Sequence, residues 1–355
     1  MAYDLDAVLV TGAGASCPFG TPLMGAWCES LVRKLASAGP GYREATGLSV
    51  NLGPEDFERV LGEFLHQVQA WEEIRPLVPF TMGLQPGQAN SGHLGADGVL
   101  PGWHNTTKIH LDKIVELIRA SLYELFAGSN IKLQEATSAY SHLLTALGVT
   151  PASRLVYATT NYDTIGESAL SQLGFRPDWG ELPAIESNSE HQLDVTHLVD
   201  AVPRSTPVLH LHGRVGWYRR QSGEVYASYA KAHEAGYGVP IVMLPDLNKA
   251  YADDVLISNI WSELDTALPR AKRVFVLGHS LHDAPLVEAI ARNVDPARVM
   301  VAIYGAGNPP NPSGGTESTQ QKAIDHGWHT TLMDFGPALS YRSDQIASWL
   351  ARTTD

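Results

Sequence analysis

Five short runs of apolar residues, rich in Val, Ile and Leu, stand out along the chain. Each is shorter than a typical helix, and the residues that follow it are Gly, Thr, Asn or His. The runs cover residues 7–10, 155–158, 208–211, 273–277 and 299–304. Nearly continuous apolar character is typical of parallel strands that helices cover on both faces. We therefore predict a parallel sheet with polar residues gathered at its carboxyl edge.

Helical periodicity dominates the segment between the first two runs. This segment holds about 140 residues, whereas one crossover needs only ~10–12 at minimum. Apolar positions recur at helical spacing in residues 22–36, 55–74, 112–126 and 133–147. The pattern predicts a Rossmann-like α/β fold, a parallel sheet with helices on both faces and a helical insertion at about 20–150. We expect one domain over 1–355, with a smaller insertion at about 214–252 and a closing helix at 343–350.

The composition excludes several functions. The chain has 355 residues, of which 44% are hydrophobic, enough for a sizeable core. Its 25 Lys and Arg face 38 Asp and Glu, a net charge of -13, which disfavours direct binding to nucleic acid or to an anionic membrane. The acidic amino terminus lacks the pattern of a secretory signal, and no stretch approaches the ~18 apolar residues of a membrane helix. We expect a cytoplasmic protein.

The two cysteines, Cys17 and Cys28, limit the chemistry further. They can supply neither a disulfide framework nor a zinc site of four thiolates. No metal is expected.

A glycine-rich turn follows the first predicted strand and reads Gly12-Ala13-Gly14-Ala15-Ser16. Glycines at such a turn let backbone N–H groups approach a pyrophosphate, which the following helix amino terminus also favours. The dehydrogenase fingerprint is missing, because helix rather than strand follows, and so is the Gly-Lys-Ser/Thr of phosphate loops. A tight turn without a ligand is the alternative.

The second predicted strand runs into Thr159-Thr160-Asn161-Tyr162-Asp163. An Asn side chain can hold a sugar hydroxyl or a water without titrating. A helix N-cap by Asn161 or Asp163 is the competing interpretation, and residue chemistry alone favours it.

The third strand ends near Leu209-His210-Leu211-His212-Gly213. On a strand, His210 and His212 would share a face, which suggests a metal, but no acidic or Cys partner stands at ligand spacing. A single His at a strand end fits a general base better. For His210 we favour a buried, hydrogen-bonded structural role.

The fourth strand ends in Gly278-His279-Ser280-Leu281-His282. The Gly-x-Ser could form the nucleophile elbow of a hydrolase with Ser280 as nucleophile, but that elbow requires Gly where His282 stands. The other interpretation is a further contact to phosphate.

Taken in order, the four motifs resemble the sirtuin superfamily, and in particular the sirtuin-like NAD hydrolases of bacterial antiphage defence. The resemblance covers roughly residues 5–335 and implies NAD+ as the substrate. It implies that Asn161 holds the nicotinamide ribose or the attacking water and that His212 is the catalytic base. It also implies NAD+-binding roles for Gly12, Ala13, Gly14, Ser16, Thr160, Asp163, Gly278, Ser280, Asp334 and Phe335.

Within that set, the resemblance places Ala13, Gly14 and Ser16 at the diphosphate. Asp163 would bind the nicotinamide carboxamide. Gly278 and Ser280 would contact phosphate or the adenosine ribose, and Asp334 and Phe335 the adenine.

Two departures separate the chain from protein-deacylating sirtuins. Those enzymes hold a structural zinc with two Cys pairs between the third and fourth motifs, and residues 213–277 contain no Cys. Their Pro-Asp-Phe-Arg run is replaced by Pro18-Phe19-Gly20-Thr21-Pro22. We therefore expect a zinc-independent NAD+ glycohydrolase that depletes NAD in abortive infection. A non-catalytic NAD or ADP-ribose sensor or scaffold and a zinc-independent deacylase are the alternatives. Such an enzyme must be silent in healthy cells, so we expect control by homo-oligomerisation or by a partner such as a HerA-type ATPase.

Overall fold

A computed structural model describes about three fifths of the chain. The described residues are 4–21, 24–38, 46–49, 60–61, 63–64, 114, 117–118, 121, 131–182, 190–201, 205–220, 223–227, 239–243, 254–304, 315–334, 340–341 and 343–352. The chain divides into two units. The first comprises Met1–Leu23, Phe126–Met243 and Ala250–Asp355, and the second Met24–Leu125 and Leu244–Lys249. The expected layout of one domain with two insertions stays a prediction.

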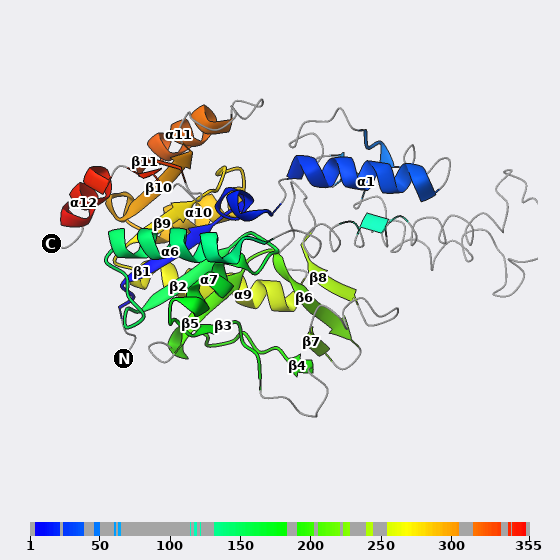
Figure 1. Cartoon of the computed structure of the whole chain (residues 1–355). Coiled ribbons are helices and arrows are strands. Elements are labelled where there is room, and N and C mark those ends of the chain that lie inside the picture. Colours follow the sequence, from blue (N-terminus) through cyan, green and yellow to red (C-terminus); the bar gives the residue numbers. More distant parts are fainter. Residues whose placement is uncertain are drawn as a thin grey trace, which may run out of the picture. The chain divides into compact units, whose positions relative to one another are not determined.

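The main sheet lies in the first unit (Figure 1). Its order is β12-β11-β10-β9-β1-β2-β5-β3, and within the described residues all its pairings are parallel except that of β12. The strands are β1 Ala7–Thr11, β2 Leu155–Thr159, β3 Pro177–Asp178, β5 Thr206–His210, β9 Val274–Leu277, β10 Val299–Tyr304, β11 His329–Asp334 and β12 Ser340–Tyr341. All five predicted strands are present, and the Rossmann-like α/β prediction is confirmed.

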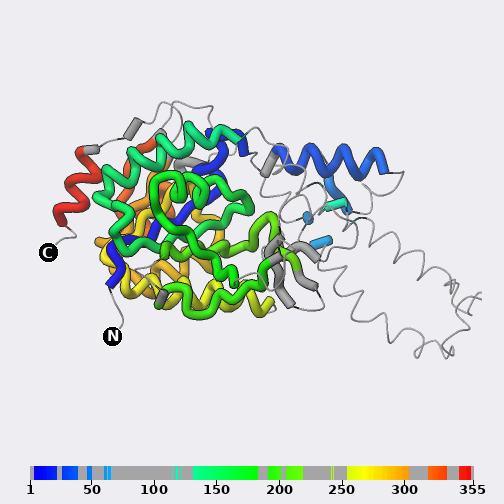
Figure 2. The backbone as a smooth tube through the Cα atoms, turned by 60° about the horizontal axis from the view of Figure 1, so that its bottom comes forward, coloured from blue at the N-terminus to red at the C-terminus, as the bar shows by residue number. Residues whose placement is uncertain are grey.

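The strand order reverses beside β1. Numbered along the chain, the six principal parallel strands β1, β2, β5, β9, β10 and β11 lie in the order 3-2-1-4-5-6. Figure 2 shows the blue amino-terminal strand lying among segments from much later in the chain. The ends of the central strands are in register, since Thr11 pairs with both Thr159 and Leu277, and Thr159 pairs with His210. In open sheets of this order, ligands bind outside the carboxyl ends of the strands at the reversal.

Helices cover both faces of this sheet (Figure 1). One core contains Leu9 and Tyr157 with residues of α6 Leu133–Ala146, α7 Ile165–Gln172 and α12 Ser343–Arg352. The other contains Val8 and Val156 with residues of α9 Val255–Ala267, α10 Ala284–Asn293 and α11 Gly315–Asp325. Adjacent strand residues point to opposite faces, so a continuous apolar run serves both cores. The shorter 3-10 helices are η1 Ala13–Ala15, η2 Cys17–Phe19, η4 Val199–Ala201, η6 Leu268–Arg270 and η7 Pro296–Arg298.

A second, antiparallel sheet occupies much of the region expected as the smaller insertion. Its order is β4-β7-β6-β8, with β4 Glu190–Gln192, β6 Gly213–Arg220, β7 Gly223–Ala227 and β8 Val239–Val242. The apolar pattern did not predict these strands, because Gly and Arg interrupt β6. A backbone hydrogen bond from Met243 N to His212 O (2.7 Å) joins this sheet to the turn after β5.

The described part of the second unit is helical and has its own core. Its helix α1, Met24–Ala38, lies close to the predicted span of 22–36. Trp27 and Leu31 are fully or almost fully buried, and the Trp27 Nε1–H donates to Ser121 Oγ (2.8 Å). The helices expected at 55–74 and 112–126 lie largely outside the described residues. Within the described segments, no helix has the length and hydropathy needed to cross a bilayer.

Candidate functional site

The turns after β1 and β9 interlock through their backbones. Gly12 N donates to Leu277 O and Gly14 N donates to Gly278 O, each at 2.9 Å. A Cβ on Gly12 would lie 2.7 Å from Gly278 O, and one on Gly278 would lie 2.2 Å from Ala15 N. Close approach of two backbones therefore explains both glycines. Within the described residues, the N–H of the exposed Ala13 has no partner in this turn.

Gly278→Ala should disrupt the close packing between the turns after β1 and β9 and so destabilise the fold. Gly278 has φ +63°, and its Cβ would clash with backbone atoms of Gly14 and Ala15. Gly148 is a matched control, because its φ is +66° and nothing lies within 4 Å of its Cβ. The strain of a positive φ alone costs about 1–2 kcal/mol, so Gly148→Ala should stay within that range. Urea unfolding should give a clearly larger loss for Gly278→Ala, and equal losses would show that the two turns are not tightly opposed.

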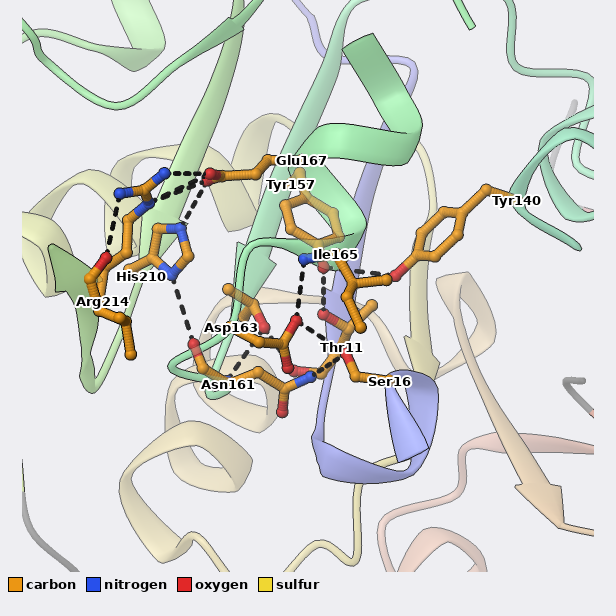
Figure 3. Close-up of polar contacts among 12 residues, drawn as sticks. Thr11, Ser16, Tyr140, Tyr157, Asn161, Asp163, Ile165, Glu167, His210 and Arg214 are labelled. Carbon is orange, nitrogen blue, oxygen red and sulfur yellow. Dashed lines mark hydrogen bonds and ion pairs between the residues drawn. The ribbon is translucent and has the colours of Figure 1, made fainter. Parts of the chain in front are cut away.

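Asn161 ties the turn after β2 to the turn after β1 (Figure 3). Its Nδ2 donates to Gly12 O and to Ser16 Oγ, both at 3.0 Å. Both amide hydrogens are thus engaged, and the polar atom that remains on the side chain is the acceptor Oδ1. Asn161 is therefore not the N-cap of α7.

Asp163 holds a buried carboxyl group whose two oxygens differ. Its Oδ1 accepts from Ser16 Oγ (3.1 Å) and from the N–H of Ile165, the first residue of α7 (2.9 Å). Asp163 therefore satisfies a free N–H at the start of α7, although the N-cap residue itself is Thr164. Its Oδ2 is buried and has no hydrogen-bond partner among the described residues. Burial raises the pKa of Asp163 above its ordinary value. A buried oxygen without a partner is costly, so Asp163 Oδ2 is suited to a ligand donor.

His210 and His212 do not share a strand face, which corrects the expectation from their spacing. The strand β5 ends at His210, and His212 lies in the turn beyond it. His210 is fully buried, with Nε2 2.9 Å from Glu167 Oε2 and Nδ1 3.3 Å from Asn161 O (Figure 3). His210 is thus buried and hydrogen-bonded as expected, and its structural role stays a prediction.

Glu167 joins His210 to Arg214 inside the protein. Arg214 Nε donates to Glu167 Oε1 (3.1 Å), and the two side chains are each 5% exposed. The Arg214 guanidinium also lies 4.9 Å from the centre of the Trp179 ring. Burial alone would raise the pKa of Glu167, but Arg214 and His210 outweigh it and lower that pKa to about 2. Glu167 was missed in the sequence because a single acid on a helix carries no distinguishing pattern.

His212 pairs with an acid that the sequence did not single out. Its Nε2 lies 2.6 Å from Asp283 Oδ2, and the two side chains are 10% and 4% exposed. The turn that carries His212 is fixed by Leu211, whose N donates to Thr159 O (2.9 Å) and whose carbonyl accepts from Trp261 Nε1 (3.1 Å). The only signal for Asp283 was an acid just before a helix, which by itself indicates a cap.

Thr160, Ser280 and Asp334 follow or end strands at the same edge of the sheet, in different environments. Thr160 N donates to Thr11 O (3.0 Å), beside the glycine-rich turn. Ser280 is exposed, and the positive φ (57°) falls on Leu281. Asp334 is the last residue of β11, separated from β1 by β9 and β10. Phe335 lies outside the described residues.

The buried Tyr157 hydroxyl contacts the last residue of β1, just before the glycine-rich turn. This hydroxyl lies 2.8 Å from Thr11 Oγ1 and 3.4 Å from the Tyr140 hydroxyl (Figure 3). Burial raises the pKa of Tyr157 to about 12, so the hydroxyl stays neutral and acts as a fixed hydrogen-bonding group. Across the described parts of the chain, no three His, Cys, Asp or Glu side chains gather as a metal site would require.

Comparisons with known proteins show the following. No family model and no curated protein matches the chain. Among solved structures, one described as "Structural Basis for the Mechanism and Regulation of Sir2 Enzymes" is 12% identical, with a TM-score of 0.37, over 99% of this chain and 94% of that chain. A Sir2 mutant with a p53 peptide and NAD is 13% identical, with a TM-score of 0.34, over 91% and 94%. Sir2Tm bound to a propionylated peptide is 14% identical, with a TM-score of 0.34, over 91% and 94%. TM-scores below 0.5 establish no family, so the function has to be inferred from the strand order and the site itself.

Proposed function

We propose that the chain is an NAD+ glycohydrolase that cleaves NAD+ to nicotinamide and ADP-ribose. One observation carries the proposal. The four polar turns follow four neighbouring parallel strands, β9-β1-β2-β5, at the point where the order 3-2-1-4-5-6 reverses. Sheets with this order bind dinucleotides across that point.

The turn after β1 is the proposed diphosphate site. The N–H of Ala13, which has no partner in this turn among the described residues, would face the phosphates at this edge of the sheet. Gly14 and Ser16 are assigned to the same site, where their hydrogen bonds to Gly278, Asp163 and Asn161 hold the turn in shape. Gly278 and Ser280 on the adjacent turn would contact phosphate or the adenosine ribose. The adenine is assigned to the end of β11, at Asp334 and Phe335.

The nicotinamide end is assigned to Asn161 and Asp163. Asp163 Oδ2, which has no partner among the described residues, can accept a hydrogen bond from the carboxamide N–H of nicotinamide. The Asn161 Oδ1 can accept one from a ribose hydroxyl or from the attacking water, because both amide hydrogens of Asn161 are engaged elsewhere. These two contacts would hold the glycosidic bond beside the turn that carries His212.

The reaction needs no general acid. When the bond between ribose and nicotinamide breaks, its electron pair passes to the pyridinium nitrogen, and nicotinamide leaves as a neutral molecule. The ribose becomes an oxocarbenium-like centre, as in other glycoside cleavages. A water then bonds to that carbon and gives its proton to His212. A base in this role contributes about 10²–10⁴-fold to the rate.

Incubation of the purified chain with NAD+ tests the proposal. Chromatography should show nicotinamide and ADP-ribose appearing in equal amounts without any peptide. An acylated peptide added in a parallel reaction separates this activity from deacylation, which releases nicotinamide only when the peptide loses its acyl group. Binding of NAD+ without release of nicotinamide, under all conditions of assembly, would replace the enzyme with a sensor or scaffold.

We further propose that this activity depletes NAD+ in the cytoplasm of phage-infected cells. Such an enzyme must be silent otherwise, so its control is assigned to homo-oligomerisation or to a partner such as a HerA-type ATPase. Light scattering alongside the assay reports whether activity follows assembly. Inactive monomer at all concentrations, with and without the partner, would contradict this mode of control.

A further inference from the structure

We infer that Asp283 is a positioning residue that fixes the tautomer and orientation of His212. The inference rests on the proposed function, because it explains how His212 would serve as a base. His212 comes from the turn after β5, and Asp283 comes from the start of α10, which follows β9. The strands β5 and β9 are the two outer members of the group β9-β1-β2-β5.

The contact itself carries the chemical argument. An ionised carboxylate can only accept hydrogen bonds, so His212 Nε2, at 2.6 Å from Asp283 Oδ2, is the nitrogen that holds the proton. The neutral imidazole has one donor and one acceptor nitrogen, which leaves the acceptor role to Nδ1. When Nδ1 takes a proton from water, the buried carboxylate stabilises the imidazolium that forms. Two side chains that are 10% and 4% exposed have little water to compete for this bond.

Comparison with other helix amino termini shows that Asp283 does not cap its helix. Asp254 precedes α9 and accepts a hydrogen bond from Ile257 N (3.1 Å), and Asp295 precedes η7 and accepts from Ala297 N (2.9 Å). Asp283 occupies the same position before α10, but its side chain makes no capping hydrogen bond. The carboxylate is directed to His212 instead, so capping does not account for an acid at this position.

Other titratable groups belong to the same turn as Asp283 or to the turn after β2, and their effects on activity must be distinguished from those of the His212–Asp283 pair. His279 and His282 belong to the same loop as Asp283, and His279 Nδ1 accepts from Leu281 N (2.9 Å). Asp163 lies in the turn after the neighbouring strand β2. These groups are unchanged in a comparison of Asp283 variants, so a difference between the variants reports on the pair.

The test compares Asp283→Asn with the matched control Asp254→Asn. Asn can donate to His212 Nε2, which would move the imidazole proton to Nδ1 and block proton acceptance there. We expect kcat for NAD+ cleavage to fall by about 10²-fold in Asp283→Asn with little change in KM. Asp254→Asn should keep the wild-type rate, because Asn also caps helices. Asp283→Glu should restore kcat to within about 10-fold, since it keeps an acceptor.

A readout independent of turnover separates this inference from the proposed function. Nitrogen-15 NMR of the histidine rings, with the His212 signal identified by its loss in His212→Asn, should show the proton on Nε2 in the wild type and on Nδ1 in Asp283→Asn. An unchanged tautomer, or unchanged kcat in an active enzyme, would overturn the role of Asp283. The expected tautomers in a protein that never cleaves NAD+ would support the pairing and overturn the glycohydrolase alone. Urea unfolding of each variant excludes a simple loss of fold.

Discussion

Replacing His212 by asparagine is expected to lower kcat for NAD+ cleavage by about 10²–10⁴-fold while the protein stays folded. Asparagine removes the titratable ring but can still donate a hydrogen bond to the carboxylate of Asp283. Alanine is a poorer test, because it would leave Asp283, whose side chain is 4% exposed, as a buried charge without its His212 partner. Asn161→Ala is similarly confounded, because it removes two hydrogen bonds that hold the turn after β1.

Initial rates of nicotinamide release, measured at saturating NAD+, give the comparison. His326→Asn is the matched control, because His326 is exposed and stacks on Trp328 away from the four turns. The control should retain the wild-type rate. If His212→Asn also retained it, His212 would not be the base, and the assignment of the reaction to this turn would fail.

Glu167→Ala is expected to lower the free energy of unfolding by about 3–5 kcal/mol. The change leaves Arg214, whose side chain is 5% exposed, buried without its carboxylate, and it removes the partner of His210 Nε2. Urea unfolding of the purified variants measures the loss. Asp265→Ala is the matched control, because the Arg292–Asp265 pair is 63% and 45% exposed and such pairs contribute only about 0–1 kcal/mol. Equal losses in the two variants would contradict a stabilising role for the buried network.

The Glu167 carboxylate should also make the free energy of unfolding depend on pH. The pKa of Glu167 falls from 4.5 to about 2 in the folded protein. A carboxyl group with a lowered pKa stabilises the fold fully above its unfolded pKa and loses that contribution as pH falls through its folded pKa. The stability of the wild type should therefore decline between about pH 4.5 and pH 2, and Glu167→Gln should lack this part of the decline. Parallel curves for the two proteins would assign the acid sensitivity to other groups.

The elements that the sequence predicted well are those with a local signature. Strands buried on both faces need apolar residues at every position, so β1, β2, β9 and β10 were visible as runs. The sheet of β4, β7, β6 and β8 was not predicted, because β4 is polar throughout, β6 and β7 contain Gly and charged residues, and Pro240 interrupts β8. The turns at the carboxyl ends of the main-sheet strands were predicted from a local pattern as well, because Gly, Asn or His follows each apolar run closely.

The partners of the two histidines could not be predicted in this way. His210 meets Glu167 across 43 residues of sequence, and His212 meets Asp283 across 71. The spacing of His210 and His212 suggested one shared face, but the end of β5 between them sends the two rings to different partners.

The sequence by itself determined the Rossmann-like sheet and the four polar turns, because buried strands and tight turns leave short, contiguous patterns of residue type. The tertiary structure alone decided which side chains work together there. It buried Asp163 Oδ2 without a hydrogen-bond partner among the described residues, placed His210 beside the buried Glu167–Arg214 pair and paired His212 with Asp283. The physical reason is that these hydrogen bonds join side chains from elements that are distant in sequence. Their partners are set by how those elements pack, which no local sequence pattern encodes.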